Sequence, residues 1–216
     1  MITVPIMLYE VIMVPFRLQL KKIKAVVFDL DNTLVSSDMN FTDLRRQLGC
    51  PPSEDLLNFV DALDHPHLRE HAHNVIFDHE ISDAEHSSPM IGCHELLAHL
   101  HQKAFKTAIV TRNCQIATQR KLEHNQITVE RVITRECFPP KPNPLSLQVL
   151  AKEWRLLPHE VLYVGDYLYD LQTAYNAQMP SCLIHHGHDL AFNNSASLSL
   201  GELSDLLGYF LSLERT

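Results

Sequence analysis

Short apolar runs that end in polar or turn-forming residues recur along this chain. Such runs are typical of strands buried on both faces of a parallel sheet. Five runs have this form: the run that follows Lys24, then Lys106–Asn113, Glu130–Thr134, Glu160–Asp166 and Pro180–Ile184. Stretches of helical length lie between them, among them 114–124 and 144–154. The alternation predicts an α/β fold, a Rossmann-like parallel sheet with helices on both faces.

The pattern changes between the first and second predicted strands. Over residues 36–91, here called the lid, apolar residues recur at helical intervals, namely Phe41, Leu44 and Leu48, then Leu56, Leu57, Val60 and Leu63. Prolines at positions 51, 52 and 66 divide this segment. It therefore predicts about three helices, a small helical cap inserted after the first strand and placed over the strand ends.

These patterns divide the chain into three parts. Residues 24–35 and 92–216 form the predicted α/β core, residues 36–91 the lid, and residues 1–23 an N-terminal extension. The extension is apolar but contains prolines and charged residues, which argue against a membrane span, and it lacks the pattern of a secretory signal. An added edge strand, a subunit contact and an artefact of start-site choice all remain open for it.

Composition and charge limit the functional classes. With 216 residues, 45% of them hydrophobic and 20% charged, the chain can bury a core, which excludes disordered and fibrous proteins. The net charge of −8 offers no basic surface for nucleic acid. The lid holds eleven acidic residues, three arginines and no lysine, so small substrates are favoured over polyanions. Five widely spaced cysteines without a Cys-x-x-Cys pair favour a reducing, cytoplasmic location.

Polar side chains collect where the predicted strands end. Asp29 and Asp31 end the first strand, and Asp166 ends the fourth. Two charges about 4 Å apart repel by roughly 4 kcal/mol at an effective dielectric constant near 20, so crowded carboxylates need cations. Lys141 offers one, and a hard divalent ion with oxygen ligands, Mg²⁺, is the natural second.

Four segments resemble, in order, the motifs of the haloacid dehalogenase superfamily of phosphohydrolases, in particular its phosphoglycolate phosphatase-like branch. They are FDLDNTL (Phe28–Leu34), IVTRN (Ile109–Asn113), Lys141-Pro142 and VGDYLYD (Val164–Asp170). The sequence departs from the commonest pattern at Asn32, where glycine is frequent, and at Gln178, where glycine commonly follows alanine. Asparagine tolerates left-handed backbone conformations, so the first change is compatible with the same turn.

The resemblance implies catalytic roles for four residues. Asp29 would be the nucleophile that forms an aspartyl phosphate, and Asp31 the general acid and then the general base. Thr111 would donate a hydrogen bond to the transferring phosphoryl group. Lys141 would neutralise charge on that group and on Asp29.

The resemblance also implies metal ligands and supporting residues. Mg²⁺ would be held by the Asp29 carboxylate, the backbone carbonyl of Asp31 and Asp166, while Asp170 would orient this shell or join it. Thr33 would brace the loop after the nucleophile. Asn113 lies in the second motif beside Arg112, which is equally compatible with binding the substrate's distal group and with pairing to a structural acid.

The implied activity is that of a Mg²⁺-dependent phosphatase for a small phosphomonoester: phosphoglycolate, a sugar phosphate or a nucleotide monophosphate. Dehalogenases typically lack the second aspartate, and phosphonatases use a cap lysine that this lid does not have. A phosphomutase of the phosphoglucomutase-like branch and a catalytically silent binding protein remain alternatives. His67 and His71, four residues apart in the lid, have spacing that can bind Zn²⁺, but a solvated polar face is favoured there. We expect no nucleic-acid or membrane partner, and the oligomeric state stays open.

Overall fold

One six-stranded parallel sheet forms the centre of the molecule, which a computed structural model describes over residues 13–213. The strands are β1 (Ala25–Phe28), β2 (Lys106–Val110), β3 (Arg131–Ile133), β4 (Val161–Gly165), β5 (Ser181–Ile184) and β6 (Leu198–Leu200). Their order in the sheet is β3-β2-β1-β4-β5-β6. The chain therefore builds outward from β1 in both directions, and β1 and β4 flank the point where the direction of winding reverses.

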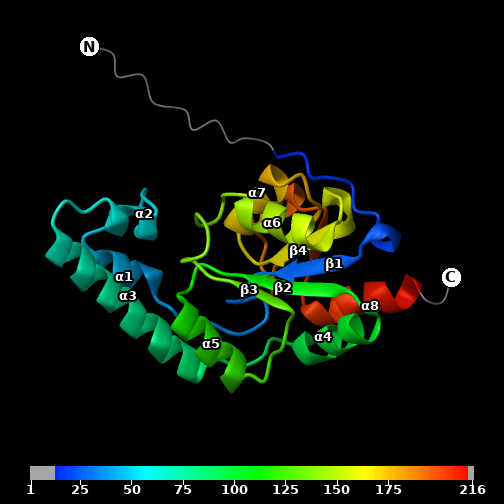
Figure 1. Cartoon of the computed structure of the whole chain (residues 1–216), viewed down its shortest axis with the longest axis horizontal. Coiled ribbons are helices and arrows are strands. Elements are labelled where there is room, and N and C mark those ends of the chain that lie inside the picture. Colours follow the sequence, from blue (N-terminus) through cyan, green and yellow to red (C-terminus); the bar gives the residue numbers. More distant parts are fainter. Residues whose placement is uncertain (1–12, 214–216) are drawn as a thin grey trace, which may run out of the picture.

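Helices cover both faces of this sheet, as the sequence predicts (Figure 1). On one face, α4 (Cys93–Gln102) and α8 (Leu203–Leu213) pack against strand residues that include Val26 and Phe28. On the other face, α6 (Leu145–Trp154) and α7 (Leu168–Asn176) pack against the alternate residues Ala25 and Val27. Because successive side chains of a strand point to opposite faces, a run buried on both faces is apolar throughout.

The five predicted strands are all present, but the sequence analysis missed β6. This edge strand is only three residues long, Leu-Ser-Leu, and follows a stretch rich in asparagine and serine. It pairs in parallel with β5, with Leu183 opposite Ser199. So short a segment carries little periodicity, and its conformation depends on the neighbouring strand rather than on a local pattern.

The lid consists of three helices between β1 and α4, namely α1 (Phe41–Leu48), α2 (Leu56–Asp61) and α3 (Pro66–His86). Asn40 caps α1 and Asp55 caps α2, each through a hydrogen bond to a backbone N–H group. The lid has a small core of its own, formed by Leu44, Cys50, Leu56, Val60, Ala72 and Ile76. This confirms the predicted helical cap after the first strand.

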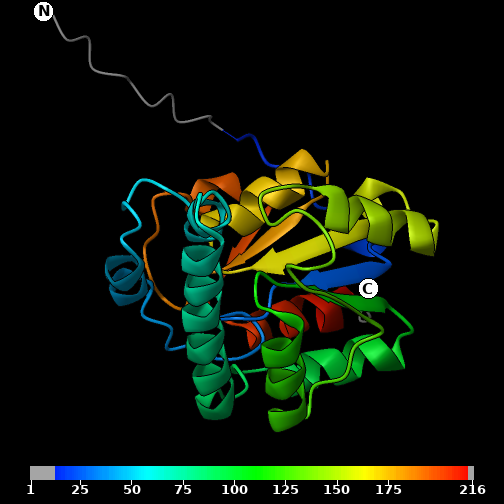
Figure 2. The ribbon, with the colours of Figure 1, turned by 60° about the vertical axis from the view of Figure 1, so that its left-hand side comes forward.

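The long helix α3 joins the lid to the core. It lies beside α5 (Gln115–His124), as both ribbon views show (Figures 1 and 2). The two segments that enter and leave the lid also pair with each other, since Ser36 N donates to the carbonyl oxygen of Ser88 at 2.8 Å. The lid is thus held by these two connecting segments, which meet in an isolated antiparallel bridge between Val35 and Pro89, and by the α3–α5 contact.

The described part of the N-terminal extension forms no strand. Met13 packs against Leu171 and Leu183, and a single 3-10 turn, η1, spans Leu20–Lys22. The remaining residues of the extension, 1–12, lie outside the described part of the chain. Within residues 13–213, none of the helices is both long and apolar enough to cross a membrane.

Both departures from the family's glycine pattern adopt a left-handed backbone conformation. The φ angle is 54° at Asn32 and 60° at Gln178. Asparagine adopts this region readily, whereas glutamine does so at a cost. The turn after Asp29 therefore keeps its left-handed residue without glycine.

Gly92 provides a test of the packing between α4 and α8. Its φ angle is +84°, and an added Cβ would lie 2.3 Å from the backbone nitrogen of Ser204. We expect Gly92→Ala to lower the free energy of unfolding by about 2 kcal/mol, because overpacking and a forced left-handed conformation each cost roughly 1 kcal/mol or more. Urea unfolding followed by circular dichroism measures the change.

Gly208 is the matched control, because it lies in the middle of α8 on the side that faces solvent. A Cβ there meets no atom within 4 Å. Gly208→Ala should raise the free energy of unfolding by about 0.5–1 kcal/mol through its better helix propensity. Equal destabilisation by the two substitutions would contradict the proposed close contact.

Candidate active site

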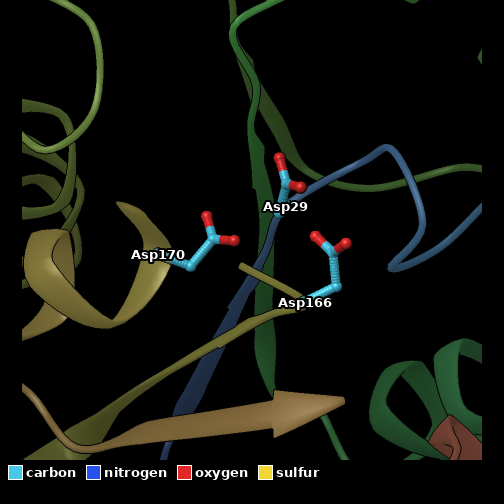
Figure 3. Close-up of side chains that lie close together, drawn as sticks. All are labelled: Asp29, Asp166 and Asp170. Carbon is cyan, nitrogen blue, oxygen red and sulfur yellow. The ribbon is translucent and has the colours of Figure 1, made fainter. Parts of the chain in front are cut away.

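Three carboxylates meet at the carboxyl ends of the two central strands. Asp29 follows β1, Asp166 follows β4, and Asp170 lies in the first turn of α7. One oxygen from each lies within 4.8 Å of the others, and Figure 3 shows the three side chains pointing toward one another. Because Phe28 pairs with Val164 in adjacent parallel strands, Asp29 stands opposite Gly165, one residue before Asp166.

Lys141 places a cation inside this cluster. Its Nζ donates to Oδ1 of Asp29 at 2.6 Å and to Oδ1 of Asp170 at 2.7 Å. The lysine is itself buried and comes from the loop between β3 and α6. Charge-assisted hydrogen bonds of this kind fix both carboxylates in place.

Asp170 is held by further contacts that leave it little freedom. The hydroxyl of Tyr163 donates to its Oδ1 at 3.1 Å, and the backbone N–H of Tyr167 donates to its Oδ2 at 3.1 Å. Gly165 makes room for it, because a Cβ at that position would lie 2.4 Å from Cβ of Asp170. These contacts suit a residue that orients its neighbours.

Burial changes the protonation of the cluster. Desolvation, reinforced by the charges of Asp170 and Asp31, raises the pKa of Asp29 to about 7 against the opposing effect of Lys141. Desolvation and the charges of Asp29 and Asp170 raise the pKa of Asp166 to about 8. Burial lowers the pKa of Lys141, but the attraction of Asp170 and Asp29 outweighs it, and the net change is upward.

This arrangement fits a divalent cation. One ammonium group contacts two of the three carboxylates, and burial together with their mutual repulsion raises the pKa values of Asp29 and Asp166 to about 7 and about 8. Hard divalent ions prefer such oxygen ligands. Within residues 13–213, three or more potential ligands come together only in Asp29, Asp166 and Asp170, and the lid histidines 67 and 71 belong to no such group there.

Asp31 is held by two donors. Asn113 Nδ2 donates to its Oδ2 at 2.9 Å, and Nζ of Lys121 donates to its Oδ1. Lys121 lies on α5 and also donates to Asp83 on α3. The sequence analysis singled out Asn113 but neither Lys121 nor Asp83, since both stand in polar helical stretches that look solvent-exposed.

The two threonines of the motifs lie in the same region. Thr111 is buried directly after β2, where its Oγ1 accepts a hydrogen bond from the backbone N–H of Asn113 at 3.1 Å. Thr33 is fully buried in the loop after Asp29, and its hydroxyl has no hydrogen-bond partner among the described residues. Its contribution to this loop is therefore packing.

Arg112 pairs with an acid of the lid. Its Nη2 donates to both carboxylate oxygens of Asp55, at 2.8 and 2.6 Å, and its guanidinium group lies 5.0 Å from the ring centre of Tyr169. Burial raises the pKa of Asp55, but the hydrogen bond and charge of Arg112 outweigh it, so the pKa is lowered. Of the two alternatives for Arg112, the structure shows the pairing with an acid.

A cavity of about 440 Å³ lies between the lid and the strand ends. Asp29, Lys141 and Asp166 are among its lining residues. The lid contributes mainly apolar side chains, which are Met39, Phe41, Leu44, Leu56, Leu57 and Ile76. This volume suits a small substrate.

The neighbouring lid residues Arg45 and Arg46 differ in their position relative to this cavity. Arg45 lines it and donates to the carbonyl oxygen of Pro51 at 3.2 Å, whereas Arg46 is largely exposed and pairs with Asp43.

His186, from the loop after β5, places Nε2 2.6 Å from the carbonyl oxygen of Asn32. The sequence did not fix its position.

Comparison with known proteins shows which family this chain is similar to. The family model described as haloacid dehalogenase-like hydrolase matches residues 26–184. A haloacid dehalogenase-like hydrolase domain-containing protein of Arabidopsis thaliana is 30% identical over 160 residues, which cover 69% of this chain and 65% of that protein. The alignment thus spans slightly less than two thirds of the Arabidopsis protein.

Two further proteins are similar over a larger share of their length. A phosphoglycolate phosphatase of Vibrio vulnificus is 28% identical over 202 residues, which cover 78% of this chain and 86% of that protein. The crystal structure of a predicted phosphoglycolate phosphatase from Haemophilus somnus superposes with a TM-score of 0.70, covering 89% of this chain and 100% of that chain, at 17% identity. The similarity to the Haemophilus somnus structure, at 17% identity, is a similarity of fold alone. Since the matched family region covers most of the chain and contains all four motifs, the chain belongs to the haloacid dehalogenase-like hydrolase family.

Proposed function

We propose that this protein is a Mg²⁺-dependent phosphatase that hydrolyses a small phosphomonoester through an aspartyl phosphate on Asp29. The observation that carries the proposal is a buried aspartate, hydrogen-bonded to Lys141 and clustered with Asp166 and Asp170, that lines the cavity between the lid and the strand ends. Membership of the hydrolase family and the name of the Vibrio relative support it. The free cysteines support a reducing, cytoplasmic location.

In the first half-reaction the Asp29 carboxylate attacks phosphorus and the ester P–O bond breaks. Asp31 gives its proton to the departing oxygen, so the alcohol leaves neutral. Lys141 offsets the negative charge of the nucleophile and of the phosphoryl group, and the Thr111 hydroxyl donates a hydrogen bond to that group.

In the second half-reaction water attacks the phosphorus of the aspartyl phosphate. Asp31, now ionised, accepts the proton of that water, the bond between phosphorus and Asp29 breaks, and inorganic phosphate forms. Both aspartates return to their starting states. One residue is thus acid and base in turn, as its place two residues after the nucleophile permits.

Mg²⁺ would be held by the carboxylates of Asp29 and Asp166 and by the backbone carbonyl of Asp31. It would supply positive charge to the phosphoryl oxygens during transfer. Asp170 is already engaged by Lys141, Tyr163 and the backbone of Tyr167, which supports an orienting role for it.

A phosphate-release assay on phosphoglycolate, sugar phosphates and nucleotide monophosphates tests the activity. We expect release of inorganic phosphate with Mg²⁺ and little without it. Isomerised sugar phosphate without release would instead establish a phosphomutase. No turnover of any substrate, together with stoichiometric binding of a partner protein, would favour a silent binding protein.

Substitution Asp29→Asn tests the covalent step. The replacement is nearly isosteric but a poor nucleophile, so kcat should fall on the order of 10⁴-fold or more. The fold should survive, because a buried charge with a raised pKa is removed. Intact-mass analysis after acid quenching should detect the phosphorylated wild type and no phosphorylated variant.

Asp43→Asn is the control for this experiment. Asp43 is exposed on α1 and pairs with Arg46 at the surface. It should leave kcat and the covalent phosphate unchanged. Retention of the phosphorylated species in the Asp29 variant would refute the assigned nucleophile.

The raised pKa values predict that stabilisation by Mg²⁺ depends on pH. Ordinary aspartates titrate near pH 4, whereas Asp29 and Asp166 do so at about 7 and 8. Between pH 4 and 8 the native state therefore binds more protons than the unfolded state, and stability without metal falls as pH rises through this window. Mg²⁺ competes with these protons.

Thermal unfolding at pH 6 and pH 8, with and without Mg²⁺, measures this effect. The increase in Tm caused by Mg²⁺ should be larger at pH 8, where fewer protons must be displaced. Asp166→Asn should shrink the increase at both pH values, and Asp43→Asn should not. An increase independent of pH would show that the cation binds away from these carboxylates.

A further inference from the structure

A second buried ion-pair cluster adjoins the carboxylates of the proposed catalytic centre. Lys121 lies on α5, and its side chain is 0% exposed. Its Nζ donates to Oδ1 of Asp31 in the core and to Oδ2 of Asp83 on the lid helix α3. The Asp83 side chain is only 5% exposed. A lysine buried this completely requires such partners, because an unpaired buried charge is strongly disfavoured.

This cluster fixes the orientation of Asp31. One carboxylate oxygen accepts from Lys121, and the other accepts from Asn113 at 2.9 Å. Both donors come from the segment that follows β2, on the core side of the cavity. With each oxygen engaged, rotation of the carboxylate would break a charge-assisted hydrogen bond.

Asp83 connects the same cluster to the first residues of the lid. Its Oδ1 accepts from the backbone N–H of Asp38 at 2.7 Å, and its Oδ2 accepts from the hydroxyl of Ser37 at 2.8 Å. Ser37 and Asp38 lie in the segment that leads from β1 into α1. Displacement of α3 would therefore remove Asp83 from Lys121, and displacement of this segment would remove two of the groups that hold Asp83.

We propose that Lys121 is a positioning residue that directs Asp31 toward the leaving-group oxygen, and that Asp83 makes this orientation depend on the seating of the lid. The proposal rests on the proposed function, in which Asp31 is the general acid. Lys121 itself touches neither phosphorus nor the leaving group. Its effect passes entirely through Asp31.

The nature of the leaving group separates this role from a purely structural one. Loss of a structural ion pair reduces activity toward all substrates alike. Loss of a well-oriented general acid matters most when the leaving oxygen is basic and must be protonated. The ratio of kcat/KM for two esters of similar shape reports this difference, because kcat/KM covers the steps up to departure of the leaving group.

The experiment compares phenyl phosphate with 4-nitrophenyl phosphate, whose phenol is far more acidic, using the full chain with Mg²⁺. In Lys121→Met, kcat/KM for phenyl phosphate should fall about 10-fold more than kcat/KM for 4-nitrophenyl phosphate, a part of the 10²- to 10⁴-fold effect of general acid catalysis. In Asp83→Asn the ratio should shift in the same direction by a smaller factor. Equal losses for both esters in Lys121→Met would overturn the positioning role, and an unchanged ratio in Asp83→Asn would overturn the coupling to the lid.

Arg120→Met is the matched control. Arg120 precedes Lys121 on α5 and pairs with Glu85 of α3, so it makes the same kind of link between lid and core, but at the surface. Its removal should leave the ratio unchanged. A shift in this variant equal to that of Lys121→Met would attribute the effect to lid anchoring alone.

Two further outcomes are distinguishable. If Lys121→Met fails to fold because two buried carboxylates lose their cation, the double variant Lys121→Met with Asp83→Asn removes one of these charges, and the same 10-fold change in ratio is expected. If the wild type releases phosphate from no phosphomonoester, the proposed function fails instead. A wild type active on both esters with equal losses in the variants refutes only the role of Lys121.

Discussion

The contact of the Lys141 ammonium group with Asp29 and Asp170 is the interaction on which the rest of the site depends. Three carboxylates with oxygens within 4.8 Å of one another would repel strongly in a buried environment, and a single lysine offsets only part of that repulsion. Burial and the remaining repulsion together raise the pKa values of Asp29 and Asp166. A site with this repulsion takes up either protons or a cation, and the competition between the two links metal binding to pH.

The parallel sheet is what allows this charge density to exist. β1 and β4 are neighbours at the point where the winding reverses, so the residues that follow them meet in a crevice that helices cannot fill. Gly165 permits the close approach of the Asp170 side chain, and the hydroxyl of Tyr163, from within β4, reaches the same carboxylate. The sheet thereby supplies rigidity, and the segments that follow its strands, including the first turn of α7, supply the charged groups.

Much of the fold and of this cluster could be predicted from the sequence, because both depend on local patterns. Apolar runs marked five strands, and aspartates placed two apart or directly after a strand marked the crevice. The edge strand β6 escaped because three residues show no period. Lys121 and Asp83 escaped for a different reason, since a charged residue in a polar helical stretch looks solvated, and only the packing of α3 on α5 buries both. Contacts between helices that are far apart in the sequence cannot be predicted from apolar periodicity or from the position of an aspartate after a strand.

The two aspartates of the first motif, Asp29 and Asp31, contact different lysines. Asp29 shares Lys141 with another carboxylate at the strand ends, whereas Asp31 shares Lys121 with a carboxylate of the lid. Asp29, the proposed nucleophile, therefore contacts a lysine of the core alone. Asp31, the proposed general acid, is linked through Lys121 to both the core and the lid. A substrate that prevents the lid from seating would still meet an oriented nucleophile but a poorly oriented acid, so selection by the lid would act on departure of the leaving group rather than on attack.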